Sequence, residues 1–330
     1  MNRLAILGAG SWGTALASVL APNFASVGLW VRQYKLAVEI AEIRENRTYL
    51  SGVKLPENVN PTHDLTQCLE GAEIVLVTIP SAYLRSVLDS AAGLIPENAV
   101  IVSATKGLEP RTLFRMSEVV RHATHIRAER VVALSGPSFA QELALYLPTA
   151  VVLGGFPEAT RTVQLAFARP SFRLYTSHDT VGVELGGALK NVVAIGAGIA
   201  TGLGLGHNAV AALITRGLAE ITRLAVSLGA EPRTLAGLAG LGDLVLTCTG
   251  DLSRNRLLGI ELSRVSNADS VLKSFPMTAE GVAAAKAAVE LGRAQGIELP
   301  VAEQMCAVLE SGRLPSDAIR RLMIRSLKEE

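Results

Sequence analysis

The chain opens with the apolar run Leu4–Leu7 (LAIL), which passes directly into Gly8–Gly13 (GAGSWG). Four apolar residues that end in glycine predict a buried strand, and residues 11–20, which Pro22 follows closely, predict a helix. With 30 glycines in the chain, this spacing alone would be a common accident. Between a strand and a helix, however, the glycines permit a tight turn, close backbone approach to a phosphate and tight helix packing. The stretch therefore predicts a dinucleotide-binding turn rather than a purely structural one.

Apolar runs continue to alternate with helical stretches up to about residue 179. This alternation predicts an α/β fold with a largely parallel, doubly wound sheet of the Rossmann type. Helices are expected at residues 11–20, 36–45 and 83–92. The expected strands are Leu4–Leu7, Val27–Val31, Glu73–Ile79, Val100–Val102, Val131–Leu134, Thr149–Leu153 and Phe172–Tyr175.

After Asp179 the pattern changes, because no clear strand remains and alanine, leucine and glycine recur at helical spacing. The sequence therefore predicts a dinucleotide-binding domain at residues 1–179 and an all-helical substrate domain at residues 180–330. The expected helices are Val181–Ile199, Ala209–Leu228, Arg254–Arg264, Ala279–Gln295, Ala302–Glu310 and Asp317–Ile324.

Length and composition are those of a globular protein. The 330 residues suffice for two domains, and hydrophobic residues make up 49% of the chain. The net charge of +1 gives no general attraction to nucleic acid or to a membrane surface. Cys68, Cys248 and Cys306 are too widely spaced for a disulfide framework or a zinc site, so we expect no metal and a reducing, cytoplasmic environment.

Two stretches imitate targeting or membrane segments. Arg3 and the apolar run containing Ala15-Leu16-Ala17 weakly resemble a signal peptide with a cleavage site, but cleavage there would remove the glycine turn. The uncharged stretch Asn191–Gly206 is shorter than the roughly 20 residues that a bilayer requires. We therefore expect a buried helix and a protein that is not embedded in a membrane.

The end of the second strand should set the cofactor preference. An acidic residue at this place would hold the ribose 2′-hydroxyl of NAD, but the strand ends in Val31-Arg32-Gln33 and no carboxylate follows before Glu39. Arg32 can meet a 2′-phosphate, stack on adenine, or simply lie in solvent. The sequence favours NADP over NAD without excluding either.

Polar and small residues follow the next strands, at the edge where an open parallel sheet binds its ligands. Lys106 lies in the segment Ser103–Gly107, where it is either functional or a solvated loop residue. Ser135–Ser138 brings small groups, including Gly136, to the same edge and suits an anionic substrate. The alternative for Ser138 is an ordinary helix cap.

Lys190 is the most unusual residue of the second half. With Asn191 it lies between Gly186-Gly187 and the uncharged stretch, so its ammonium is costly to bury unless a ligand or carboxylate compensates it. Partial burial would lower the pKa of the lysine and prepare it for proton transfer. The alternative is a lysine that extends its charged end to solvent.

A carboxylate followed by phosphate-type donors lies further along the chain. Asp243 follows Gly240-Leu241-Gly242, and arginine, amide and hydroxyl groups that match phosphate oxygens come next. The same residues could equally form a charged helix start. They are Thr247, Ser253, Arg254 and Asn255.

Together these segments resemble the bacterial-type NAD(P)-dependent glycerol-3-phosphate dehydrogenase family, in family order from Ile6 to beyond Glu280. The matching segments are Gly8–Gly13, Asn46–Leu50, Ser103–Gly107, Ser135–Ser138, Leu189–Asn191 and Gly242–Asn255. The sequence departs from the resemblance after Arg32, where Gln33 and Tyr34 replace the more basic or polar residues expected.

The resemblance also implies roles for individual residues. Cofactor contacts are implied for Gly8, Gly10, Ser11, Trp12, Gly13, Arg32, Lys106, Ala140, Arg254, Thr278 and Glu280. Substrate contacts are implied for Lys106, Gly136, Ser138, Lys190, Asp243, Thr247, Ser253, Arg254 and Asn255. Lys190 matches the catalytic lysine of the family, with Asp243, Lys106 and Asn191 as its catalytic neighbours.

The implied reaction is hydride exchange between NADPH or NADH and C2 of dihydroxyacetone phosphate, giving sn-glycerol 3-phosphate for phospholipid synthesis. Lys190 would protonate the ketone oxygen, and Arg254 would hold the phosphate. A β-hydroxyacid dehydrogenase is a second interpretation, but the Lys-x-x-x-Asn arrangement typical of that class is absent because Ala194 stands at the fourth position. A dinucleotide-sensing protein without turnover is a third. The oligomeric state, including a homodimer, is left open.

Overall fold

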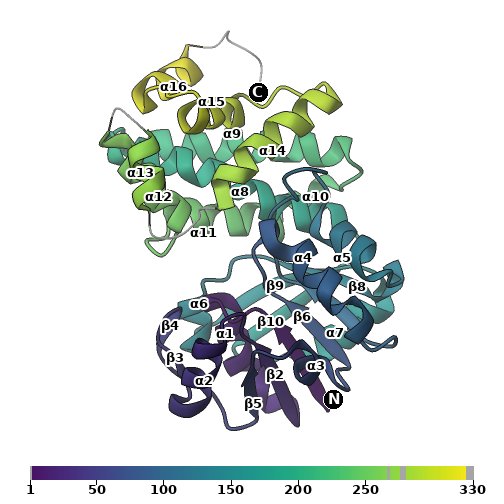
Figure 1. The fold of residues 1–330 in the computed structure, drawn as a ribbon. Coiled ribbons are helices and arrows are strands. Elements are labelled where there is room, and N and C mark those ends of the chain that lie inside the picture. The colour runs from purple at the N-terminus through teal and green to yellow at the C-terminus, as the bar shows by residue number, and fades with distance from the viewer. Residues whose placement is uncertain (1, 266–267, 276–279, 325–330) are drawn as a thin grey trace. The chain divides into compact units, whose positions relative to one another are not determined.

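The computed structural model describes residues 2–265, 268–275 and 280–324. Figure 1 shows the chain, which forms two compact units. The N-terminal unit contains Met1–Glu109 and Phe114–Glu184, and the C-terminal unit contains Pro110–Leu113 and Leu185–Glu330. This division falls after Glu184, whereas the sequence predicts a boundary after residue 179.

An eight-stranded sheet forms the centre of the N-terminal unit (Figure 1), in the order β10-β9-β8-β7-β6-β1-β2-β5. All neighbouring strands are parallel except β8 and β9. The prediction of a largely parallel sheet is confirmed. The strands are β1 (Arg3–Leu7), β2 (Ser26–Trp30), β5 (Val59–Thr62), β6 (Ile74–Val77), β7 (Val100–Ser103), β8 (Val131–Ser135), β9 (Thr149–Gly154) and β10 (Phe172–Ser177).

The strand order makes the sheet doubly wound. From β1 the chain moves to β2 and β5 on one side, and then crosses to β6, β7 and β8 on the other. The order therefore reverses between β1 and β6, and ligands of such sheets bind in the crevice outside the carboxyl ends of the strands at this point. Residues 8–13 follow β1 at this edge.

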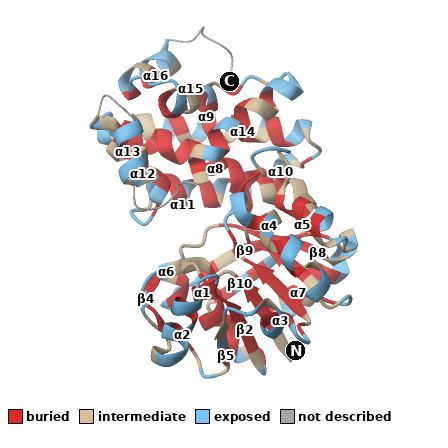
Figure 2. Cartoon of the chain, in the orientation of Figure 1, coloured by how far each residue is buried: buried red, intermediate tan, exposed pale blue. Residues whose placement is uncertain are grey.

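Helices cover both faces of the sheet. Alternate residues of β1 enter two different cores, with Leu4 and Ile6 in one and Ala5 and Leu7 in the other. Figure 2 shows the buried strands between the two helical layers of this unit. The first core includes residues of α1 (Ser11–Leu20), α2 (Tyr34–Ile43), α6 (Ala140–Ala144) and α7 (Pro157–Phe167). The second includes residues of α3 (Leu65–Leu69), α4 (Ser81–Ala91) and α5 (Met116–Thr124).

The segment after α2 differs from the prediction. The helix expected to reach Glu45 ends at Ile43, because Arg44 takes the left-handed conformation with a φ of 56°. A short antiparallel hairpin then follows, formed by β3 (Glu45–Asn46) and β4 (Leu50–Lys54). The edge strand β5 was also not predicted. Three short 3-10 helices complete the unit, namely η1 (Ala21–Asn23), η2 (Ala92–Leu94) and η3 (Ala128–Arg130).

After β10, the described part of the chain contains helices and no strand, as the sequence predicts. α8 starts the series, and among the single helices of the described residues it is the one long and apolar enough to cross a membrane; 94% of its most apolar window is buried inside the protein. It thus forms the predicted buried helix. The series consists of α8 (Thr180–Gly202), α9 (Gly206–Ser227), α10 (Pro232–Leu235), the π-helix η4 (Leu238–Gly242), α11 (Asp243–Thr249), α12 (Arg254–Ser263), α13 (Ala268–Ser274), α14 (Glu280–Gln295), α15 (Pro300–Glu310) and α16 (Pro315–Met323).

Candidate active site

The glycine turn, residues Gly8–Gly13, joins β1 to α1. Gly8 has a φ of 117°, a backbone conformation that residues other than glycine rarely adopt. A Cβ at Gly13 would lie 1.9 Å from the carbonyl oxygen of Gly8, so the helix can approach the strand only without a side chain there. The turn therefore requires glycine at both positions for its own geometry.

Gly10 differs from these two, because a Cβ at this residue would meet no protein atom within 4 Å. Gly10 is also the N-cap of α1, and the first turn of α1 contains no acidic residue. The amide groups at the start of a helix attract anions, and the missing side chain lets a phosphate come close to the backbone. Contacts within the protein therefore do not require glycine at this position. Close approach of a dinucleotide pyrophosphate to the backbone would require it, so the turn fits such a cofactor.

Two polar side chains hold the glycine turn, the buried Asn46 and the partly buried Thr78. The Asn46 amide donates to the carbonyl oxygen of Ala9 and to the hydroxyl of Thr14, both at 2.8 Å. The hydroxyl of Thr78, which follows β6, donates to the carbonyl oxygen of Gly8 at 2.8 Å. No role was predicted for Asn46, and Thr78 was not among the predicted residues. A polar residue directly after an apolar strand was the available signal for Thr78.

The other predicted cofactor residues of this unit surround the turn or follow neighbouring strands. Ser11 and Trp12 open α1, and the Trp12 ring packs against the core of that face. Among the described residues, the buried indole N–H of Trp12 has no acceptor. Arg32 is exposed beyond β2, and Ala140 is the first residue of α6.

Lys106, Gly136 and Ser138 lie together beyond the ends of β7 and β8. The ammonium of Lys106 donates to the carbonyl oxygen of Gly136 at 3.1 Å, and the Ser138 hydroxyl donates to the same oxygen at 2.9 Å. The alternative interpretation of Ser138 as a helix cap is wrong, because Phe139 is the N-cap of α6. The structure thus joins three predicted residues around one backbone carbonyl.

In the C-terminal unit, α8 lies directly against the π-helix η4. A Cβ at Gly186 would lie 2.5 Å from the carbonyl oxygen of Ala239, so these two backbones touch. Residues four apart lie on the same face of a helix. Lys190 therefore follows Gly186 on this face of α8, and Asp243 begins α11 directly after η4.

The lysine centre consists of Lys190, Asp243 and Thr247, all nearly buried. The exposed fraction of the side chain is 9% for Lys190 and 1% for Asp243. The Lys190 ammonium donates to the carboxylate of Asp243 and, at 2.8 Å, to the hydroxyl of Thr247. Asp243 thus supplies the carboxylate that a buried lysine requires.

Thr247 has a different geometry from the phosphate donor that the sequence suggested. Its hydroxyl donates to the backbone carbonyl of Asp243 at 2.6 Å while it accepts from Lys190. Its one hydroxyl proton is therefore used within α11. Beside it, burial raises the pKa of the Cys248 thiol to about 12, although the charge of Lys190 opposes this, so the thiol stays protonated at neutral pH.

Asn191 and Asn255 meet the start of α14. Asn191 donates to the carboxylate of Glu280 at 3.4 Å, and the side-chain oxygen of Asn255 accepts from the backbone N–H of Gly281 at 3.1 Å. Asn191 therefore contacts Glu280, a predicted cofactor residue, whereas the resemblance implied it as a catalytic neighbour of Lys190. Thr278, also predicted to bind the cofactor, lies outside the described residues.

The start of α12 carries the remaining predicted substrate residues. Ser253 is the N-cap, and its hydroxyl accepts from the backbone N–H of Arg256 at 3.2 Å. Arg254, the first residue of the helix, is exposed. Ser253 thus has a structural role as a cap, and the exposed guanidinium follows it at a helix N-terminus, where anions are favoured.

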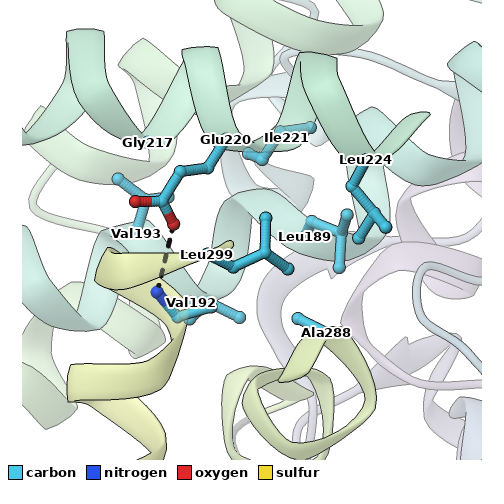
Figure 3. A pocket seen from close by; sticks show the side chains of 10 residues that line it. Leu189, Val192, Val193, Gly217, Glu220, Ile221, Leu224, Ala288 and Leu299 are labelled. Atoms are coloured by element: carbon cyan, nitrogen blue, oxygen red, sulfur yellow. Dashed lines mark hydrogen bonds between the residues drawn. The ribbon is translucent and has the colours of Figure 1, made fainter. Parts of the chain in front are cut away.

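Glu220 of α9 is another buried carboxylate of the C-terminal unit. It accepts from the backbone N–H groups of Val301 at 2.8 Å and of Ala302 at 3.3 Å, at the start of α15. Burial raises its pKa from 4.5 to about 7. Glu220 lines a cavity of about 20 Å³. Figure 3 shows its carboxylate among apolar lining side chains such as Leu189 and Leu224.

Comparison with known proteins shows similarity along the whole chain. Residues 3–160 match the family model of the NAD-dependent glycerol-3-phosphate dehydrogenase N-terminus, and residues 179–320 match that of the C-terminus. A glycerol-3-phosphate dehydrogenase (NAD(P)+) from Koribacter versatilis is 50% identical, covering 98% of both chains. One from Geobacter sp. strain M21 is 48% identical over 100% of this chain and 99% of its own.

A solved structure agrees with this assignment. The crystal structure of glycerol-3-phosphate dehydrogenase from Coxiella burnetii is 38% identical, covers 98% of this chain and 99% of its own, and superposes with a TM-score of 0.93. Two family models together match most of the chain, and the relatives align over nearly their whole length. The chain therefore belongs to the NAD-dependent glycerol-3-phosphate dehydrogenase family.

Proposed function

We propose that this protein catalyses the reversible reduction of dihydroxyacetone phosphate to sn-glycerol 3-phosphate with NADPH or NADH. The observation that carries the proposal is the lysine centre, a buried lysine with a carboxylate partner, in a chain that also contains the glycine turn. The family and its relatives, named for this activity, support the same substrate.

Lys190 acts as the general acid for the ketone oxygen, and as the base in the reverse direction. An ammonium has three N–H donors, and bonds to Asp243 and Thr247 fix its orientation. Negative charge on the ketone oxygen develops mainly in the transition state, so a fixed positive donor lowers the barrier more than it strengthens substrate binding. Asp243 provides the negative partner of this donor in a buried place.

The nicotinamide cofactor, when bound, supplies or accepts the hydride at C2 of the substrate. On this proposal, the glycine turn holds the cofactor pyrophosphate, with Ser11, Trp12 and Arg32 beside it. Arg254 and Asn255 bind the substrate phosphate, and Arg254 with Glu280 also approaches the cofactor. Holding the phosphate at a distance from the ketone uses binding energy to orient the reacting carbon.

Lys106, Gly136 and Ser138 are the proposed substrate contacts of the N-terminal unit. The bond from Lys106 to the Gly136 carbonyl keeps its ammonium beside the backbone on which Ser138 lies. A cation held at this edge of the sheet suits both the phosphate of the substrate and that of the cofactor. Ala140 lies at the start of the following helix and would contact the cofactor.

The product supplies the backbone of glycerophospholipids, and we propose the cytoplasm as the place of the reaction. NADP is the preferred cofactor in this proposal, because Arg32 follows the second strand and the sequence has no carboxylate between it and Glu39. The partner is the small-molecule substrate, and a homodimer is compatible with the apolar helix faces. Turnover distinguishes this proposal from the alternative of a dinucleotide-sensing protein, which would bind the cofactor without a reaction.

The decisive experiment measures the oxidation of NADPH with dihydroxyacetone phosphate by the wild type and by Lys190→Ala. Turnover should fall by about 10²–10⁴-fold, while the Kd of NADPH changes little, because the lysine acts on the ketone. Lys286→Ala is the matched control, because this lysine lies on the surface of the same unit with 60% of its side chain exposed.

Two results would contradict the proposal. The first is a wild type that binds NADPH but oxidises none of it with this ketone. The second is a Lys190→Ala variant that retains more than about a tenth of the wild-type rate, because a positioned acid is worth more than that.

A further inference from the structure

Tyr83 and Arg32 form an exposed pair at the sheet edge that carries the glycine turn. The guanidinium carbon of Arg32 lies 5.9 Å from the centre of the Tyr83 ring, within the range of a cation–π contact. Tyr83 is 54% exposed although it is a large aromatic residue. Within the described part of the chain, Arg32 makes no ion pair, so its charge is not neutralised by a carboxylate.

The strand order places this pair across the end of β1. Leu7 of β1 pairs with Trp30 of β2 on one side and with Val77 of β6 on the other, so the three parallel strands end level. Arg32 follows β2, and Tyr83 lies in the first turn of α4, which follows β6. The two side chains thus reach toward each other from both sides of the strand that leads into the glycine turn.

We propose that Tyr83 is a positioning residue that sets the preference of this protein for NADPH over NADH. Its ring holds the Arg32 guanidinium at the end of β2, where the adenine ribose of a dinucleotide binds in a sheet of this order. The inference rests on the proposed function insofar as that function places a nicotinamide dinucleotide on the glycine turn.

The difference between the two cofactors explains why positioning matters. NADPH carries a 2′-phosphate with close to two negative charges, whereas NADH carries a neutral hydroxyl at the same position. A guanidinium binds a phosphate through two parallel hydrogen bonds, which demand a fixed orientation. A flexible arginine loses rotamer freedom on binding, and a ring that orients it beforehand removes part of that cost.

The experiment measures the Kd of NADPH and of NADH by calorimetry, without the ketone, for the wild type, Tyr83→Ala and Tyr83→Phe. Tyr83→Ala should lower the NADPH preference about two- to fivefold, the size of an exposed cation–π contact. Tyr83→Phe retains the ring and should keep the preference. In an Arg32→Ala background, Tyr83→Ala should cause no further change.

The same sheet offers a matched control at its other edge. Arg173 and Tyr175 of β10 form a similar pair at 5.2 Å, and Tyr175 is 45% exposed. β10 lies at the far end of the strand order from β2 and β5. Tyr175→Ala should therefore leave both Kd values unchanged, which separates a local effect from general damage to the sheet.

Several results would overturn the inference. Tyr83→Ala could weaken the binding of both cofactors equally, or leave the NADPH preference unchanged. Tyr83→Ala could also change the preference as much in the Arg32→Ala background as in the wild type. Finally, Tyr83→Phe could lower the NADPH preference as much as Tyr83→Ala does. Turnover with dihydroxyacetone phosphate is measured in parallel. A wild type that binds NADPH without turnover contradicts the proposed function, while the binding data still decide the role of Tyr83.

Discussion

The glycine turn is built from backbone, whereas the lysine centre is built from side-chain charge. In the turn, missing side chains at Gly8 and Gly13 create the shape, and neutral hydrogen bonds from Asn46 and Thr78 hold it. In the lysine centre, Lys190 and Asp243 neutralise each other in a buried place. The first region should therefore be sensitive to added volume, and the second to a change of charge.

The largest effect is expected when the charge balance of the lysine centre is broken. Asp243→Asn keeps the size of the side chain but leaves Lys190 buried beside a neutral amide. Loss of one partner of a buried pair costs about 3–5 kcal/mol, so the free energy of unfolding in denaturant should fall by this amount, together with turnover. An unchanged free energy of unfolding would mean that the pair contributes only to the reaction.

The double variant Lys190→Met with Asp243→Leu is the matching control. It removes both charges and replaces them with apolar side chains of similar size, which is often neutral for stability. We expect stability near that of the wild type with no turnover. A double variant as unstable as Asp243→Asn would show that shape, and not charge, limits this region.

Glu220 tests whether a buried carboxylate held by backbone N–H groups behaves differently from Asp243, which pairs with a buried lysine. Its partners are backbone N–H groups, with Arg223 and Glu303 as the charged neighbours, and burial raises its pKa from 4.5 to about 7. A raised carboxyl pKa means that the folded protein binds the proton more tightly than the unfolded chain. The stability contribution is therefore present at low pH and is lost as the pH rises from about 4.5 to 7.

The corresponding variant is Glu220→Gln, whose side chain does not titrate. The difference in unfolding free energy between wild type and variant should shift by up to about 3 kcal/mol across this pH window, in favour of the variant at the upper end. Thermal or denaturant unfolding at several pH values measures it. Parallel pH curves for the two proteins would assign Glu220 an ordinary pKa.

Arg254 combines features of both regions, because its charged side chain lies at the N-terminus of α12, where backbone N–H groups are also exposed. Arg254→Ala should reduce the preference for dihydroxyacetone phosphate over dihydroxyacetone by about 10–100-fold, the value of a charge-assisted hydrogen bond. kcat/KM for both ketones is measured at saturating NADPH, since this residue is also a proposed cofactor contact. An undiminished preference would mean that Arg254 does not bind the substrate phosphate, and Lys106 would then be the next candidate.

The smallest effect separates two glycines of the same turn. Gly13→Ala places a Cβ 1.9 Å from the Gly8 carbonyl oxygen, so overpacking should cost about 1–3 kcal/mol of stability along with NADPH affinity. Gly10→Ala meets no protein atom within 4 Å and should keep stability while it weakens NADPH binding. Equal losses of stability in the two variants would contradict the role given to Gly10.

The backbone-built region was the easier of the two to predict from the sequence. The glycine spacing and the apolar strand before it are local, and α1 has the predicted bounds, Ser11–Leu20. The buried helix around Lys190 was also predicted, because uncharged residues surround it. Both features follow from residues that are neighbours in the chain.

Features that depend on distant residues could not be predicted in the same way. Asn46 reaches Ala9 across 37 positions, and its hairpin strands are too short and too polar to show a period. Lys190 and Asp243 are 53 positions apart, and only the packing of α8 against η4 brings them together. Ser138 was a reasonable cap by residue type, but the helix starts two residues later, at Ala140.

The π-helix before Asp243 has a consequence for how the length of this chain can vary. Its wider turn, in which Gly242 donates to the carbonyl oxygen of Gly237, contains one residue more than an α-helical turn. Loss of that residue would rotate everything after it by roughly 100° relative to α8 and carry Asp243 away from Lys190. Insertions and deletions during evolution should therefore be rejected between Gly237 and Asp243, but tolerated at exposed turns such as Gly204–Gly206. The extra residue of the π-helix thus acts as a spacer. The length of this segment is constrained because it places Asp243 beside Lys190.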